Sequence, residues 1–181
     1  PVLDRADIAE SQPFKIIGFV LVTKPDTIGE ILRVGDLYTI KWAISGTMNT
    51  VKIEWSTNGD LDPWNYINTV SAGVTGGEYN WPVSDTISSN VKIRVADSSI
   101  PEANGVSPQV LIKGKLRLDE PKGNESYLPM IIGNTYGITW TTQGSITNVA
   151  IEFTYDYTPT GITVWNNITN TTTAPGTRVY Y

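Results

Sequence analysis

Alternating apolar and polar residues define the most informative stretch of this chain. Residues 35–42 are predicted to form a β-strand. Tyr38, Ile40 and Trp42 fall on one face of that strand, because successive side chains point to opposite sides. Residues 133–140 carry Gly, Tyr, Ile and Trp at the same offsets, 98 positions later. We therefore expect the chain to be organised around this repeated strand.

The next strand, at residues 51–56, alternates in the same way. Its apolar members are predicted to point into the core, where they would face the preceding strand: Val51, Ile53 and Trp55. Its polar members are predicted to face solvent: Lys52, Glu54 and Ser56. Over the whole chain, the residues expected in the core are Tyr38, Ile40, Trp42, Val51, Ile53, Trp55, Tyr79, Trp81, Tyr136, Ile138 and Trp140.

Strand-like segments recur about every eight to twelve residues, separated by turn-forming residues, and this spacing is typical of immunoglobulin or fibronectin type III sandwiches. We predict an all-β fold of tandem immunoglobulin-like β-sandwich domains joined end to end. Residues 1–18 would be the C-terminal tail of a preceding repeat, and 19–114 a complete repeat. Residues 115–181 would be a second repeat, truncated before its last strands, and any targeting segment would lie upstream.

The junctions between the predicted repeats are very short. Residues 11–18 match residues 107–114 at a spacing of 96, and each stretch runs directly into the first strand of the next repeat. Only Gly114 interrupts the second junction, and neither junction contains a Ser/Gly-rich or Pro-rich tether. Such a connection limits the rotation of neighbouring domains, so we expect a semi-rigid rod.

Composition narrows the classes of function. The net charge is −5 with no cluster of Lys and Arg, which excludes tracking of a nucleic-acid backbone. No apolar run reaches eighteen residues, so no membrane insertion is expected in this segment. Cys and His are absent, which excludes disulfides, Cys/His zinc sites and His-based catalytic triads. The low charged content of 17 %, with abundant Thr, Asn, Ser and Gly, is the profile of an extracellular all-β protein.

Three Asn-x-Ser/Thr sequons occur in the second repeat, at Asn124, Asn167 and Asn170. In a secreted protein of eukaryotic or archaeal source these would accept N-linked glycans. The alternative is chance, which a chain rich in Thr and Asn makes substantial.

Acidic residues in turns are the candidate metal ligands. Asp60 and Asp62 follow an Asn-Gly turn and offer clustered oxygen atoms to Ca²⁺. Residues 97–104 contain a second set of such oxygen atoms. The alternative is that these side chains hydrogen-bond their own backbone, as Asp and Asn in turns usually do. No other cofactor is expected.

Two tryptophans, Trp64 and Trp165, stand at strand starts beside turns rather than in the alternating core pattern. Their rings are candidate platforms for stacking against a ligand such as a sugar, although a fold of this class implies no particular site. The adjacent carboxyls of Asp119 and Glu120 are interpreted as solvated strand ends, because a glycosidase needs two carboxyls across a cleft.

The order of motifs suggests a family. Five motifs follow one another along the chain: Gly35, the Tyr-x-Ile-x-Trp strand, the Val-x-Ile-x-aromatic strand, Gly-x-Tyr-x-Trp-x-Val at residues 77–83 and Ile-Arg-Val-x-Asp at 93–97. This order resembles the immunoglobulin-like, Kre9/Knh1-type repeat domains of cell-wall and cell-surface proteins of fungi, bacteria and archaea. The resemblance implies a surface module rather than an enzyme.

Our main functional hypothesis is a structural tandem-repeat module of an extracellular or cell-surface protein: a stalk, a wall or sheath component, or part of a filament. Its partners would be neighbouring repeats, or other copies pairing through exposed sheet edges. The alternative is an adhesion module that binds cell-surface glycans or proteins. An enzyme is the third and least favoured hypothesis.

Overall fold

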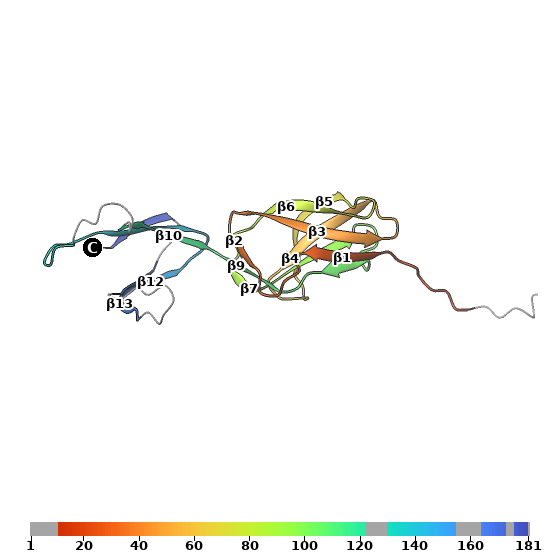
Figure 1. Ribbon diagram of the computed structural model, residues 1–181. Coiled ribbons are helices and arrows are strands. Elements are labelled where there is room, and N and C mark those ends of the chain that lie inside the picture. Colours follow the sequence, from red (N-terminus) through yellow and green to blue (C-terminus); the bar gives the residue numbers. More distant parts are fainter. Residues whose placement is uncertain (1–10, 122–129, 155–163, 173–175, 181) are drawn as a thin grey trace, which may run out of the picture.

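The computed structural model describes residues 11–121, 130–154, 164–172 and 176–180, and every regular element in them is a β-strand (Figure 1). The predicted all-β class is therefore confirmed. The first unit, residues 19–114, contains β1 (Phe19–Lys24), β2 (Ile31–Arg33), β3 (Leu37–Ser45), β4 (Thr50–Ser56), β5 (Asn65–Ser71), β6 (Gly76–Pro82), β7 (Ser88–Asp97), β8 (Asn104–Val106) and β9 (Val110–Lys113). The second unit, the described residues from 115 onward, contains β10 (Lys115–Glu120), β11 (Ile138–Gln143), β12 (Asn148–Phe153), β13 (Asn166–Thr172) and β14 (Gly176–Tyr180).

The first unit is a sandwich of two sheets. One sheet has the strand order β1-β3-β6, and the other has the order β2-β9-β7-β4-β5 with β8 paired to β7. All these pairs are antiparallel except β2 with β9, which run parallel. The two sheets face each other across one core, which is the arrangement of an immunoglobulin-like sandwich (Figure 1).

Alternate positions of the strands fill the core of the first unit. Ile40 and Trp42 of β3 are buried, as are Val51 and Ile53 of β4. The indole Nε1 of Trp42 donates a hydrogen bond to the carbonyl oxygen of Ala72 at 3.1 Å, so its polar atom is satisfied inside the core. Four more aromatic residues, one buried and three half-buried, pack in or against this core: Tyr38, Trp55, Tyr79 and Trp81.

The second unit begins with the same pairing scheme. Strands β10, β11 and β14 form one sheet, and β12 and β13 form another. Trp140, Val149 and Ile151 are buried between them, with Ile138 packed alongside. Its core is smaller than that of the first unit because, among the described residues, nothing corresponds to β7, β8 or β9.

The structure corrects the prediction for Tyr136. β11 begins at Ile138, whereas the repeat predicted a strand from residue 133. Tyr136 therefore lies before the strand with 39 % of its surface exposed, and it is not a core residue. Its hydroxyl oxygen instead accepts a hydrogen bond from the backbone N–H of Ile131 at 2.7 Å.

The outward side of β4 also differs from the prediction. Glu54 and Ser56, expected in solvent, are both buried. The Ser56 hydroxyl donates to the carbonyl oxygen of Leu61 at 2.9 Å and accepts from the N–H of Asn58 at 3.0 Å, so the loop after β4 folds back over the strand end. Alternation predicted the side to which each residue points, but not what covers that side.

Candidate functional site

The connection between the two units is a single glycine with close neighbours. β9 passes into β10 across Gly114 alone (Figure 1). A Cβ atom on Gly114 would lie 2.7 Å from Cγ1 of Ile146 and 2.9 Å from the carbonyl oxygen of Gln143. The Gln143 side chain in turn lies so close to Gly35 that a Cβ there would be 2.1 Å from its Nε2 atom. A side chain at Gly114 would therefore displace the turn of the second unit that contains Gln143 and Ile146, and that turn is the one that lies against Gly35 of the first unit.

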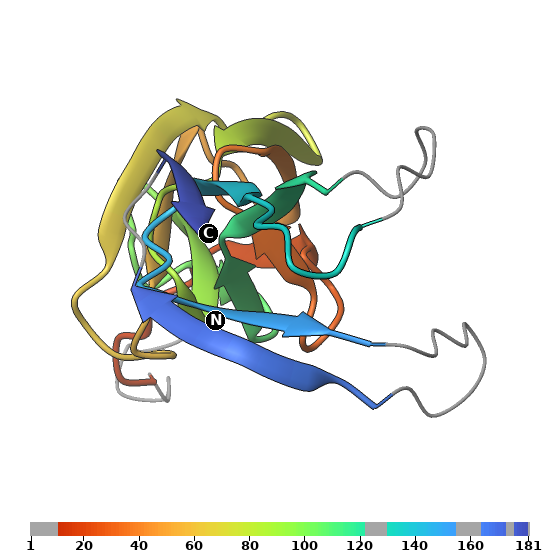
Figure 2. The same cartoon turned by 90° about the vertical axis from the view of Figure 1, so that its left-hand side faces the viewer.

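Two acidic residues from separate loops of the first unit hold the second unit. The Asp85 carboxylate accepts both the backbone N–H and the hydroxyl of Ser145, each at 2.8 Å. The Asp36 carboxylate accepts from the Lys115 ammonium at 2.5 Å. Asp36 follows β2 and Asp85 follows β6, and the two loops are hydrogen-bonded to each other through Gly35, Asp36 and Val83, so the two anchors hold the second unit at one patch of the first. Figure 2 views the molecule from the end that carries the second unit, so this unit lies in front of the first.

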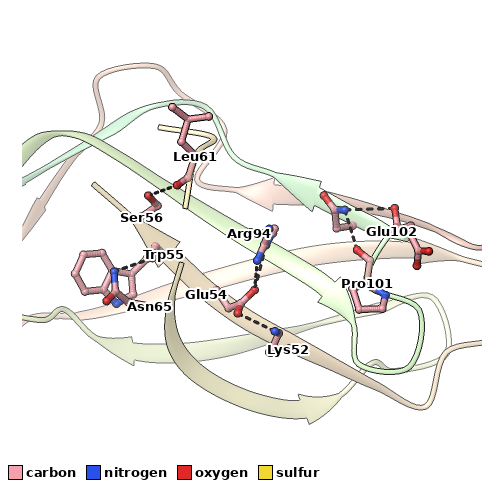
Figure 3. Close-up of polar contacts among 10 residues, drawn as sticks. Lys52, Glu54, Trp55, Ser56, Leu61, Asn65, Arg94, Pro101 and Glu102 are labelled. Atoms are coloured by element: carbon pink, nitrogen blue, oxygen red, sulfur yellow. Dashed lines mark hydrogen bonds and ion pairs between the residues drawn. The ribbon is translucent and has the colours of Figure 1, made fainter. Parts of the chain in front are cut away.

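A charged cluster lies on the outer face of the larger sheet of the first unit (Figure 3). Glu54 of β4 accepts from Lys52 Nζ at 2.9 Å through Oε1, and from Arg94 Nη2 at 2.7 Å through Oε2. Glu54 and Arg94 are directly opposite each other in the β4–β7 register, which brings residues 40 positions apart into contact. The carboxylate is buried yet flanked by two cations.

The ionisation of Glu54 should make stability depend on pH. Burial raises the pKa of Glu54, but the hydrogen bonds and charges of Lys52 and Arg94 outweigh it, so the pKa falls below its ordinary value of 4.5. The ionised Glu54 carboxylate stabilises the fold fully above pH 4.5. This stabilisation is lost as pH falls through the lower pKa of the folded state, because the unfolded chain binds more protons than the folded chain in that range. Chemical denaturation at a series of pH values should show a shallower acid-side loss of stability for Glu54→Gln than for the wild type.

The exposed pair Lys41–Glu78 supplies the control for this measurement. Glu78→Gln should keep the acid-side slope of the wild type, because an exposed ion pair contributes about 0–1 kcal/mol. Equal slopes for the wild type and Glu54→Gln would contradict the role given to Glu54.

The two candidate stacking tryptophans have different surroundings. Trp64 is half-buried, and the guanidinium carbon of Arg94 lies 4.2 Å from its ring centroid. The ring face beneath Arg94 is therefore occupied by a cation–π contact rather than open to a sugar. Trp165 has an exposed ring and precedes β13. The structure does not bring the two together in one site, and a ligand role for either stays a prediction.

Of the two predicted Ca²⁺ ligands Asp60 and Asp62, the carboxylate of Asp60 is engaged with a lysine. Both carboxylate oxygens of Asp60 accept from Lys92 Nζ, at 2.8 and 3.0 Å. Asp62 contributes its backbone carbonyl oxygen to the side chain of Asn58 at 3.3 Å. Within the described ranges, no three His, Cys, Asp or Glu side chains gather as a metal site would require. In the other loop, Asp97 accepts from the backbone N–H of Ser99, as the turn alternative expected.

The sequons fall in different parts of the chain. Asn124 lies outside the described residues, and Asn170 belongs to β13. Asn167 is on the same strand, opposite Glu152, with an exposed side chain. Glycosylation at these positions stays a prediction.

Sequence reasoning missed the residues that hold the junction and the charged cluster. Asp36 and Asp85 look like any acidic residue in a turn, and their partners lie 79 and 60 positions away. Glu54 and Arg94 stand at solvent positions of regular alternation. No local signal distinguishes these residues, because what makes them special is a partner from a distant strand.

Comparisons with known proteins leave the family open. No family model matches the sequence, and no curated protein matches it. Among solved structures, the chain is similar to one described as fibronectin(III)-like modules of Clostridium thermocellum CbhA, with 17 % identity and a TM-score of 0.31. The alignment covers 90 % of this chain and 78 % of that one. In the described part of the chain, no helix is long and apolar enough to cross a membrane.

Proposed function

We propose that this chain is a structural segment of an extracellular or cell-surface protein, in which sandwich units follow one another and act as a stiff spacer. The observation that carries the proposal is the junction at Gly114, where Gln143 packs on Gly35 and two acidic anchors hold the second unit to the first. A spacer needs a defined distance and direction between its ends, and a one-residue connection with anchors in two loops provides both.

Matching local geometry supports the proposal that the units are repeats. β1 pairs with β3 with a register shift after Val22, and β10 pairs with β11 with a register shift after Leu118, 96 positions later. Gly46 and Gly144, 98 positions apart, both have positive φ, and a Cβ on either would approach the glycine just before the first strand of its unit, Gly18 or Gly114. The same turn thus packs on the same chain entry in both units.

The proposed location rests on composition and resemblance. A chain with few charges and many Thr and Asn residues has the composition expected of an extracellular all-β protein. The cell-wall repeat domains that the motif order resembles have that location. Glycans on the sequons of the second unit would keep an extended spacer hydrated.

The stiffness of the junction can be measured by distances between spin labels. The chain has no Cys, so Ile28→Cys and Val164→Cys, both at exposed positions in different units, would carry the only labels. We expect one narrow distance distribution in dilute solution. Adding Asp36→Ala and Asp85→Ala should broaden it, because the second unit then loses both side-chain anchors on the first unit.

A matched control changes the same charge elsewhere. Asp26→Ala with Asp60→Ala also removes two carboxylates from the first unit, but neither contacts the second unit. The distribution should stay narrow in that variant. A broad distribution in the protein with intact anchors would overturn the proposed spacer.

A further inference from the structure

The chain contains two Asn-Gly pairs, and the structure gives them opposite surroundings. Asn58-Gly59 lies in the loop between β4 and β5, whereas Asn104-Gly105 lies in β8. A glycine after an asparagine lets its backbone nitrogen approach the side-chain amide closely, because glycine has no Cβ atom to obstruct the approach. Whether that nitrogen attacks the amide depends on the hydrogen bonds that hold each group.

The backbone nitrogen of Gly59 is not engaged by the rest of the described chain. Gly59 has a φ of +64°, in the left-handed region, and among the described residues no hydrogen bond involves its N–H. Asn58 is exposed, and its Nδ2 donates to the carbonyl oxygen of Asp62 at 3.3 Å. That distance exceeds the usual range of about 2.7–3.2 Å for a hydrogen bond of this kind. The Asn58 amide is therefore weakly held and open to water.

The backbone nitrogen of Gly105 is held in a β-ladder instead. Two positions along the same ladder, the N–H of Asp97 donates to the carbonyl oxygen of Ala103 at 2.9 Å. Hydrogen-bonded pairs occur at every second position of an antiparallel ladder, so Gly105 and its partner Val95 form the next such pair. The N–H of Gly105 is thus committed to β7.

The side chain of Asn104 is restrained as well. Its Nδ2 donates to the carbonyl oxygens of Pro101 at 2.9 Å and Glu102 at 3.3 Å. A Cβ atom on Gly105 would lie 2.4 Å from the carbonyl oxygen of Val20, so β1 packs directly on this part of β8. Attack on the Asn104 amide therefore requires β8 to separate from both β7 and β1.

We propose that Asn58 is a site of spontaneous deamidation, whereas Asn104 is protected from the same reaction. The backbone nitrogen of Gly59 forms a bond to Cγ of Asn58 and loses its proton, while the bond from Cγ to Nδ2 breaks and Nδ2 leaves as ammonia. Water then opens the resulting cyclic imide at either of its two carbonyl groups. One opening gives aspartate, and the other gives isoaspartate, in which the main chain runs through the former side chain. This inference does not rest on the proposed spacer role, because it concerns one loop of the first unit.

The reaction should loosen the loop that covers the end of β4. The buried hydroxyl of Ser56 accepts from the N–H of Asn58 and donates to the carbonyl oxygen of Leu61, the second of which is drawn in Figure 3. Isoaspartate inserts a methylene group into the backbone between these two contacts. Aspartate replaces the amide that donates to Asp62 with a carboxylate that repels the same carbonyl oxygen. Both products therefore oppose the present closure of the loop.

Peptide mapping by mass spectrometry, on the full chain incubated at mildly alkaline pH, tests the proposal. Deamidation raises the mass of the affected peptide by about 1 Da, and the aspartate and isoaspartate forms separate in chromatography. In the folded chain, Asn58 should react about tenfold faster than Asn104 or more, because Gly105 must first leave its ladder. Equal rates in the folded chain, or no reaction at Asn58, would overturn the proposal.

The unfolded chain provides the matched control for these rates. In urea, both Asn-Gly pairs are exposed to the same solvent, and the two should react at similar rates. A preference for Asn58 that is as large in urea as in the folded chain would show that the fold does not protect Asn104. Asn58→Gln should remove the reaction at this position from the folded chain, because its longer side chain closes a ring less readily.

Hydrogen exchange measures the effect on the loop. Asn58→Asp introduces one product directly, and the backbone amides of positions 58 and 61 should exchange about threefold faster or more than in the wild type. Asn49→Asp makes the same change of charge at another exposed position of the first unit, and should keep the wild-type exchange in this loop. Circular dichroism of each variant would verify that it is folded. Unchanged exchange in Asn58→Asp, or equal acceleration in Asn49→Asp, would overturn the loosening of the loop.

Discussion

Replacing Trp42 with alanine should lower the free energy of unfolding of the first unit by about 3–5 kcal/mol, the range for truncating a buried aromatic residue. Trp42 is buried in the centre of β3, between β1 and β6 in the sheet. Its removal leaves a cavity against Gly77, whose backbone the indole ring contacts closely. It also leaves the carbonyl oxygen of Ala72 without its donor. Urea denaturation followed by circular dichroism would measure the loss.

The repeat provides a matched pair that separates packing from hydrogen bonding. Trp42→Phe loses the hydrogen bond to Ala72 and should cost about 1–3 kcal/mol more than Trp140→Phe, whose indole donor has no partner among the described residues. Trp165→Ala, at an exposed ring, should change stability little. A cost for Trp42→Ala no larger than that of Trp165→Ala would contradict the core role of Trp42.

Replacing Arg94 with alanine should destabilise the first unit by about 3 kcal/mol, the lower end of the range for breaking a buried ion pair. The change leaves the buried carboxylate of Glu54 with one cation, Lys52. It also uncovers the ring of Trp64, over which the guanidinium lies. Denaturation at neutral pH would measure the effect.

Two further variants decide whether the penalty comes from an uncompensated charge. Arg94→Leu combined with Glu54→Leu removes both partners, and should cost less than Arg94→Ala alone. Lys41→Ala breaks an exposed pair with Glu78, and should cost about 0–1 kcal/mol. If the double variant were the least stable of the three, the charge argument would fail and packing would explain the loss.

Strand alternation predicted much of the fold because it reports a local property of the backbone. Ile40, Val51 and Ile53 are buried at the positions that a period of two requires. The same rule predicted that Glu54 faces solvent, whereas its side chain is buried. Which side a residue faces is local information, whereas the covering of that side depends on Arg94 from β7.

The sequence repeat predicted the spacing of equivalent residues better than the ends of the strands. It located Trp140, which is buried like Trp42, but it placed Tyr136 in the core by analogy with Tyr38. In the first unit the Tyr38 hydroxyl bonds to Glu30 at 2.9 Å. In the second unit the corresponding tyrosine serves a turn at Ile131 instead, and β11 starts after it.

The junction between the two units was also predicted only in part from the sequence. The short linker, and hence close neighbouring units, followed from the sequence around Gly114. The anchors at Asp36 and Asp85 did not, because each reaches a partner that only the folded chain brings near. Candidate sites of this kind depend on long-range contacts, and such contacts have no periodic signature.

The path of the chain through the first unit has a mechanical consequence. The chain enters through β1 at one end and leaves through β9 at the other, directly into β10 (Figure 1). Tension applied along the long axis therefore pulls β1 against β3, and β9 against β2 and β7, along the strand direction. Ladder hydrogen bonds lie across that direction, so they bear the load in parallel instead of opening one after another. The first unit should resist extension in shear, and the closely packed Gly114 passes the load to its neighbour.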